Sequence, residues 1–168
     1  MTQLMPHNDI QIAVGKFGEA VIGPQRQQLT VAVHSGMAPI RTLSSGTVRM
    51  AGGHHALPHI HAESEIQVYV VRGRIASLVG PDLTPLLHGP GSLLYIAPGL
   101  EHVGVNLDPY EPADLVEFCT DPAFNADVIR IDGLDALAET RVTDLRREYL
   151  LGRCDEQLAT PSVHAVTR

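Results

Sequence analysis

The stretch GGHHALPHIHAESE, residues 52–65, concentrates metal-ligand chemistry, because it holds four of the nine histidines of the chain and two glutamates. Side chains two residues apart in a β-strand point to the same face, so His59 and His61 can direct both imidazoles at one point. Glu65 follows after three residues and can add a carboxylate oxygen. Imidazoles with one carboxylate suit Fe, Mn, Ni, Cu, Co or Zn. The stretch therefore predicts a site for one divalent transition metal.

A further imidazole for this site is available from His102. It lies in GPGSLLYIAPGLEHVGVN, residues 89–106, where Pro98 and Gly99 predict a tight turn. His102 begins the strand that returns from this turn. We therefore expect His102 to complete the metal site.

The first of these segments resembles the first sequence motif of the cupin superfamily. That motif is glycine, five residues, His-x-His, three or four residues, glutamate, and then a glycine. Its positions are matched by Gly53, His59, His61, Glu65 and Gly73.

The second segment resembles the second cupin motif, which is glycine, five residues, Pro-x-Gly, two residues, histidine, three residues and asparagine. Gly91, Gly99, His102 and Asn106 match it, whereas Ala97 stands where the motif has its first proline and Pro98 follows. Either arrangement can make a tight turn.

The resemblance covers residues 35–120, approximately, and is strongest to small bacterial single-domain cupins. It implies an all-β fold, the double-stranded β-helix or jelly-roll barrel of cupins. It also implies that His59, His61, Glu65 and His102 are the metal ligands.

The position of Glu65 departs from the motif in one respect. Counted back from Gly73, the ligand position falls on Ile66, since seven residues rather than six separate Glu65 from that glycine. In a regular strand Ile66 would then face inward and Glu65 outward. A β-bulge would return Glu65 to the interior.

The candidates for catalytic acid–base residues beside the metal are Glu65, Gln67 and His55. If Glu65 points inward, Gln67 does so too; otherwise Val68 fills the barrel. His54 and His55 also fit a solvated loop. We expect the remaining histidines, His34, His88 and His164, to be structural or surface residues.

The pattern around these motifs indicates short strands followed by helix. Predicted strands lie at 29–36, 45–53, 65–80, 92–99, 102–106 and 114–121, and the pattern changes after 126–132. The chain is interpreted as one cupin domain, 1–168, with a barrel core at about 29–131, short C-terminal α-helices at about 132–152 and a flexible tail at 153–168. Asp132 is the expected helix cap and Gly152 the expected stop. Residues 1–28 carry no clear pattern.

Composition narrows the classes of partner and location. Twelve basic and nineteen acidic residues give a net charge of −7, with no basic cluster for nucleic acid. No apolar run reaches the roughly 20 residues needed to span a membrane. Two cysteines and no leader segment favour the cytoplasm. Open edge strands favour a homodimer, in which the N-terminal segment is exchanged.

These features favour a metal-dependent enzyme that acts on a small, partly apolar organic substrate. An oxygenase for an enol, keto or aromatic compound is the first hypothesis. An isomerase, cyclase or lyase of the same fold is the alternative if the metal acts as a Lewis acid. A cupin that binds a small molecule without turnover is the remaining hypothesis.

Overall fold

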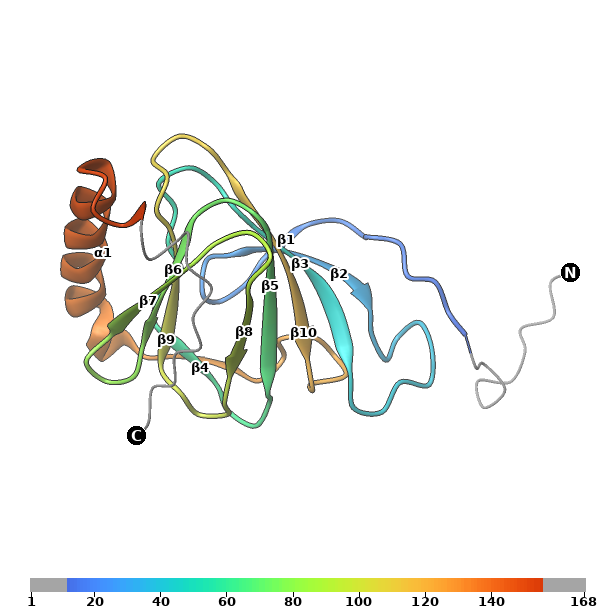
Figure 1. Cartoon of the computed structure of the whole chain (residues 1–168). Coiled ribbons are helices and arrows are strands. Elements are labelled where there is room, and N and C mark those ends of the chain that lie inside the picture. Colours follow the sequence, from blue (N-terminus) through green and yellow to red (C-terminus); the bar gives the residue numbers. More distant parts are fainter. Residues whose placement is uncertain (1–11, 156–168) are drawn as a thin grey trace, which may run out of the picture.

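Two antiparallel sheets face each other in the computed structural model, which describes residues 12–155 (Figure 1). The six-stranded sheet has the order β1-β2-β3-β10-β5-β8, and the five-stranded sheet has the order β11-β4-β9-β6-β7. The strands of the first sheet are β1 (Val21–Ile22), β2 (Gln28–Val33), β3 (Ser44–Met50), β5 (Ile66–Arg72), β8 (Leu93–Ile96) and β10 (Ala113–Cys119). Those of the second are β4 (His59–His61), β6 (Ile75–Val79), β7 (Thr84–His88), β9 (His102–Asn106) and β11 (Val128–Arg130). The all-β expectation is confirmed.

Alternating side chains of the six-stranded sheet build the core between the two sheets. In β5, Ile66, Val68 and Val70 are buried while the residues between them are exposed. β3 and β10 alternate in the same way. The inward residues of these strands form one apolar cluster, so the interior of the barrel is mainly apolar.

The five-stranded sheet is covered on its outer face as well. All five residues of β6 are buried. Ala76 and Leu78 pack with Ala138 and Val142 of the helix α1 (Asp135–Leu150), which lies against this sheet (Figure 1). This leaves the opposite faces of β6 and β9 for the barrel interior.

The C-terminal helix confirms the expected change of pattern. A 3₁₀ turn, η2 (Asp132–Leu134), precedes α1, and Gly152 ends the helix with a φ of +71° and an N–H that donates to the carbonyl of Tyr149. The expected cap at Asp132 is wrong, because Asp132 lies within the 3₁₀ turn and pairs with Arg130 instead of capping the helix.

Gly73 carries the chain from one sheet to the other. It lies between β5 and β6 with a φ of +100°, and a Cβ there would lie 2.5 Å from the Cβ of Ala113. Only glycine meets both conditions without strain. This glycine of the first motif therefore allows the chain to pass from β5 to β6 in close contact with Ala113, the first residue of β10.

Three strands, β1, β7 and β11, lie outside the strands predicted from the sequence. β1 is only two residues long, and β7 contains Pro85, which is unusual within a sheet but tolerated because β7 is an edge strand. Residues 1–11, and 156–168 of the predicted tail with His164, lie outside the described residues. Within 12–155, no helix combines the length and the apolar character that crossing a membrane requires.

Candidate metal centre

Three histidines from two neighbouring strands converge in the barrel interior. His59 and His61 lie on β4, and His102 lies on β9, where it is the direct partner of His59. All three are at least 94% buried, and one potential ligand atom from each lies within 4.8 Å of the others. The structure therefore brings together the three predicted imidazoles.

Backbone carbonyls fix two of the imidazoles. Nδ1 of His59 lies 2.8 Å from the carbonyl oxygen of Leu57, and Nδ1 of His102 lies 2.9 Å from that of Leu100. A carbonyl oxygen only accepts hydrogen bonds, so Nδ1 carries the proton in both rings. The unprotonated Nε2 of each ring is then available as a ligand.

The electrostatics of the centre favour neutral imidazoles. Burial, and next the neighbouring His102, hold the pKa of His59 well below its usual range. Burial and then His61 lower the pKa of His102 to about 4. Burial also lowers the pKa of His61, although Asp127 opposes that shift. Neutral imidazole is the form that binds metal, so these rings need not lose a proton near pH 7.

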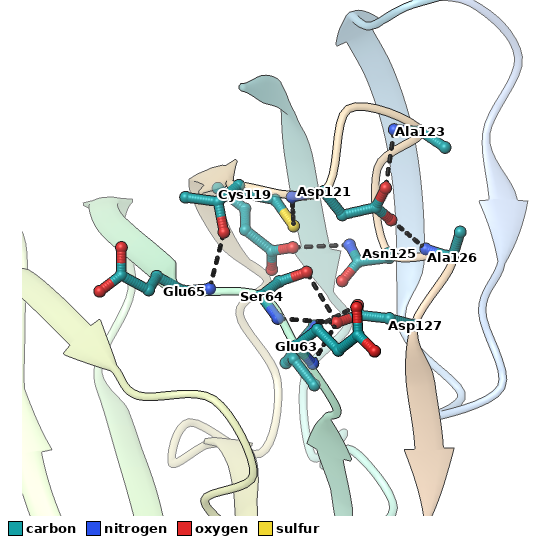
Figure 2. Close-up of polar contacts among 12 residues, drawn as sticks. Glu63, Ser64, Glu65, Cys119, Asp121, Ala123, Asn125, Ala126 and Asp127 are labelled. Carbon is teal, nitrogen blue, oxygen red and sulfur yellow. Dashed lines mark hydrogen bonds and ion pairs between the residues drawn. The ribbon is translucent and has the colours of Figure 1, made fainter. Parts of the chain in front are cut away.

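Asp127 supports the third imidazole from outside. Its Oδ1 lies 3.6 Å from Nδ1 of His61, and neither atom has a hydrogen-bond partner. Its Oδ2 accepts hydrogen bonds from the backbone N–H groups of Glu63 and Ser64 and from the Ser64 hydroxyl (Figure 2). A carboxylate behind a ligating histidine is a common arrangement that orients the ring and raises its basicity.

These observations show that the residues fit a metal ion. Nitrogen atoms of three neutral, buried rings lie close together, and two of the rings already donate their other N–H to a fixed acceptor. His59, His61 and His102 would hold a first-row transition metal, with further coordination positions left for water or substrate.

The structure corrects the predicted fourth ligand. Glu65 is exposed and its carboxylate accepts a hydrogen bond of 2.9 Å from the Tyr95 hydroxyl. Ile66, which six residues separate from Gly73, faces the interior instead, as expected for a regular strand without a bulge. No bulge occurs at this end of β5, because the shift in its pairing with β10 lies at Asp114 and Leu115. Figure 2 shows the Glu65 side chain pointing away from Ser64 and Asp127.

The other two catalytic candidates also lie outside the interior. Gln67 is exposed on the outer face of β5, two residues from Glu65. His55 forms a bridge with Val105, and its Nε2 lies 3.1 Å from Oε1 of Glu139 on α1. The structure therefore places Glu65 and Gln67 on an exposed face and the half-buried His55 beside α1, and none of the three lines the cavity of the three histidines.

A cavity of about 40 Å³ adjoins the three histidines, which is room for a few water molecules or a small ligand. Apolar side chains of both sheets form most of its wall. Its polar lining, besides the three histidines, comes from Gln27, Ser77, His88 and Glu117.

Sequence reasoning missed these four residues. His88 was expected to be structural or exposed, but it lines the cavity, and its Nε2 lies 2.9 Å from the Ser77 hydroxyl. Burial lowers its pKa to about 4. The alternation of β10, with Glu117 in phase with the buried Leu115 and Cys119, was the signal that could have found Glu117. Cys119 is a free, buried cysteine.

Comparison with known proteins rests on structure alone, since neither a family model nor a curated protein matches the chain. An uncharacterised protein of Klebsiella pneumoniae with a double-stranded β-helix domain is similar, with 15% identity, 77% of this chain and 97% of that chain covered, and a TM-score of 0.52. The cupin domain of Cnp3 from Schizosaccharomyces pombe matches with 12% identity, 62% and 69% of the two chains, and a TM-score of 0.52. The chain has the cupin fold.

Larger cupin proteins share this fold over part of their length. An oxalate decarboxylase of Lactobacillus farciminis, in complex with formate, is 20% identical over 77% of this chain and 37% of its own, with a TM-score of 0.56. The chain thus spans little more than a third of that enzyme. At such identities the likeness shows the cupin fold and leaves the activity to be argued from the site.

Proposed function

We propose that this cupin-fold chain is a metal-dependent enzyme that acts on a small organic molecule bound beside His59, His61 and His102. The observation that carries the proposal is the convergence of three neutral, buried imidazoles at a cavity with mainly apolar walls. A structural metal site is normally closed by four protein ligands, whereas three leave a position open for chemistry.

The metal would polarise an oxygen of the substrate and, if redox-active, bring an enol, catechol or keto acid together with dioxygen. The chain's own residues prepare that centre. The carbonyls of Leu57 and Leu100 hold two rings in one tautomer, and Asp127 stands behind the third. The apolar wall excludes bulk water and favours a partly apolar substrate.

Oxygenation is the reaction that we propose first. A set of nitrogen ligands without a carboxylate suits iron, nickel and copper as well as zinc. Zinc in the same site would instead favour an isomerase, cyclase or lyase. The buried Glu117 supports this second candidate, because such reactions need a residue that moves a proton.

The test is oxygen consumption by the wild-type protein reconstituted with iron(II), screened with enols, catechols and keto acids, beside His61→Ala. We expect consumption with at least one class and its loss in the variant. The His55→Ala variant is the matched control, because it removes a histidine outside the cavity. If a screened compound binds but causes neither oxygen consumption nor conversion, the result would favour a cupin that binds a small molecule without turnover.

Two further expectations stay predictions of the sequence, namely the cytoplasmic location and the homodimer. Exposed apolar side chains on the outer face of the six-stranded sheet are compatible with an interface there. They are Tyr69, Val71, Leu93, Tyr95 and Phe118. Light scattering on the purified protein tests the dimer directly.

A further inference from the structure

Glu117 lies in the sheet that faces the three histidines. It is one of the four inward residues of β10 and is paired with Gly46 on β3 and Val68 on β5, whereas the histidines lie on β4 and β9 of the opposite sheet. Both groups line the same cavity. A small molecule bound at the histidines therefore has Glu117 in the opposite wall.

The surroundings of Glu117 are those of a functional carboxyl and not of a structural ion pair. It is 5% exposed, and no lysine or arginine is among the described residues that line the cavity. Nδ2 of Asn125 donates a hydrogen bond of 2.6 Å to its Oε1. A buried carboxyl without a cation is costly, so its retention inside an apolar wall calls for a function.

Asn125 holds this carboxyl from the loop that also carries Asp121 and Asp127 (Figure 2). The loop is fixed by Asp121, whose two carboxylate oxygens accept from the backbone N–H groups of Ala123 and Ala126. One contact thus fixes Oε1 of Glu117, which leaves Oε2 for a ligand in the cavity.

We propose that Glu117 is a catalytic acid–base residue for a small carbonyl compound with an acidic C–H bond, held by its oxygen at the three-histidine end of the cavity. This inference rests on the second candidate of the proposed function, the isomerase, cyclase or lyase reaction, and names its substrate class. It also assigns the proton transfer to a residue that neither sequence motif contains.

The step conserves atoms and electrons without an oxidant. The carboxylate of Glu117 takes the proton from the carbon beside the carbonyl, which forms an O–H bond on Glu117 and breaks the C–H bond. The C–H electron pair becomes the carbon–carbon π bond of an enolate, whose negative oxygen lies at the histidine end. Return of a proton to the same carbon re-forms the carbonyl compound and exchanges its hydrogen with solvent. In a hydroxyketone, return of the proton to the former carbonyl carbon completes an isomerisation, because the hydroxyl proton then moves to the former carbonyl oxygen and the hydroxyl carbon becomes the new carbonyl.

The charge of the cavity fits this substrate class. Glu117 is the only carboxylate among the described lining residues, and no cation there would hold a second anionic group. A neutral ketone or hydroxyketone can lie between the three histidines and Glu117 without charge repulsion. A dicarboxylate would be repelled by Glu117 whenever the Glu117 carboxyl is ionised.

Few titratable groups face Glu117. From β4 and β9 they are the three candidate ligands, from β7 His88, and on its own strand Cys119. β3 and β5 contribute only apolar lining. Burial raises the pKa of Glu117 to about 7, against the hydrogen bond from Asn125, so both of its protonation states are populated near neutral pH.

The experiment uses hydroxyacetone as the probe and zinc as the metal, because zinc is redox-inert and reports proton transfer alone. Exchange of the carbon-bound hydrogens with D₂O is followed by proton NMR. We expect exchange with the wild-type protein, about 10²–10⁴-fold slower exchange with Glu117→Gln, and no change with the matched control Glu65→Gln. The wild-type rate should rise as pH rises through about 7, and the residual rate of the variant should not.

Binding of hydroxyacetone to both proteins is measured by calorimetry and should be similar. Exchange that survives in Glu117→Gln overturns the inference while the metal function stands. Wild-type protein that binds zinc but neither binds hydroxyacetone nor speeds its exchange overturns the substrate class. Failure of the wild type to bind zinc overturns the proposed function with it.

A second readout needs neither metal nor substrate. The infrared difference between wild type and Glu117→Gln should contain a protonated carboxyl band that disappears as pH rises through about 7. If this band is absent at pH 5, the Glu117 carboxyl does not hold a proton there, and the acid–base role would be contradicted.

Discussion

His59 and His102 are directly opposed residues of the antiparallel ladder between β4 and β9, and their ring centroids lie 4.2 Å apart. Opposed residues in a ladder have the shortest distance that two strands allow. Each ring also meets the carbonyl of the residue two positions before it. The backbone, rather than flexible side chains, thus sets the distance between these two candidate ligands, and His61 adds the third from the same face of β4.

Substitution His61→Ala should remove tight metal binding and leave the barrel folded. The ring is one of three ligands, and water can fill the space that it leaves beside the cavity. Circular dichroism of the metal-free variant should match the wild type, and added zinc should no longer raise its Tm. Loss of the whole fold would mean that His61 is a structural residue.

Asp127→Asn should weaken metal binding by about 10–100-fold, the usual effect of removing a carboxylate behind a ligating histidine. The amide keeps the shape of the side chain but removes the charge 3.6 Å from Nδ1 of His61. A competition assay with a zinc-binding dye measures this change. The matched control is Glu63→Gln, which removes a nearby exposed carboxylate; equal affinity losses in both variants would contradict an orienting role for Asp127.

Glu117→Gln should make metal-free protein less sensitive to rising pH. The pKa of Glu117 is about 7 in the fold and about 4.5 when unfolded, so between these values the folded state binds the extra proton. Its contribution to stability is therefore full below about pH 4.5 and is lost as pH rises through 7. Urea unfolding at pH 5 and pH 8 should show a loss on the order of 3 kcal/mol that the variant lacks. Equal pH dependence in both proteins would contradict the burial argument.

The substitution His88→Gln tests a residue whose effect on the pH dependence of stability has the opposite sign. Burial lowers the pKa of His88 from about 6.5 to about 4, so the unfolded chain binds the proton between these values. Wild-type stability should therefore fall as pH decreases from 6.5 towards 4, by on the order of 2–3 kcal/mol from this residue. Urea unfolding of the metal-free variant, whose amide can still bond Ser77, should show a smaller decrease.

The sequence was sufficient to predict the convergence of the histidines that belong to regular strands. His59 and His61 are two apart in a strand, and His102 begins the strand after a Pro-Gly turn, so period and turn chemistry placed all three. The C-terminal helix was also predictable, from the helical spacing of its apolar residues and from the glycine that follows its end.

The rest of the site depended on register and on long-range pairing. One residue of difference in spacing decides between Glu65 and Ile66, and the pairing of Ile66 with Cys119 settles it. Glu117 and His88 carry no local motif, and they reach the cavity only because β10 and β7 take their places in the two sheets. The strand that carries His88 was also not predicted, because it contains Pro85, and proline is unusual within a strand except at the edge of a sheet.

The most direct test of the central claim is the metal content of protein purified without a histidine tag or chelator, measured by inductively coupled plasma mass spectrometry. The three-histidine centre predicts close to one transition-metal ion per chain in the wild type, either as purified or after reconstitution, and its absence in a variant with His59, His61 and His102 all replaced by alanine. Wild-type protein that takes up no metal after reconstitution, or a triple variant that keeps the ion, would contradict it.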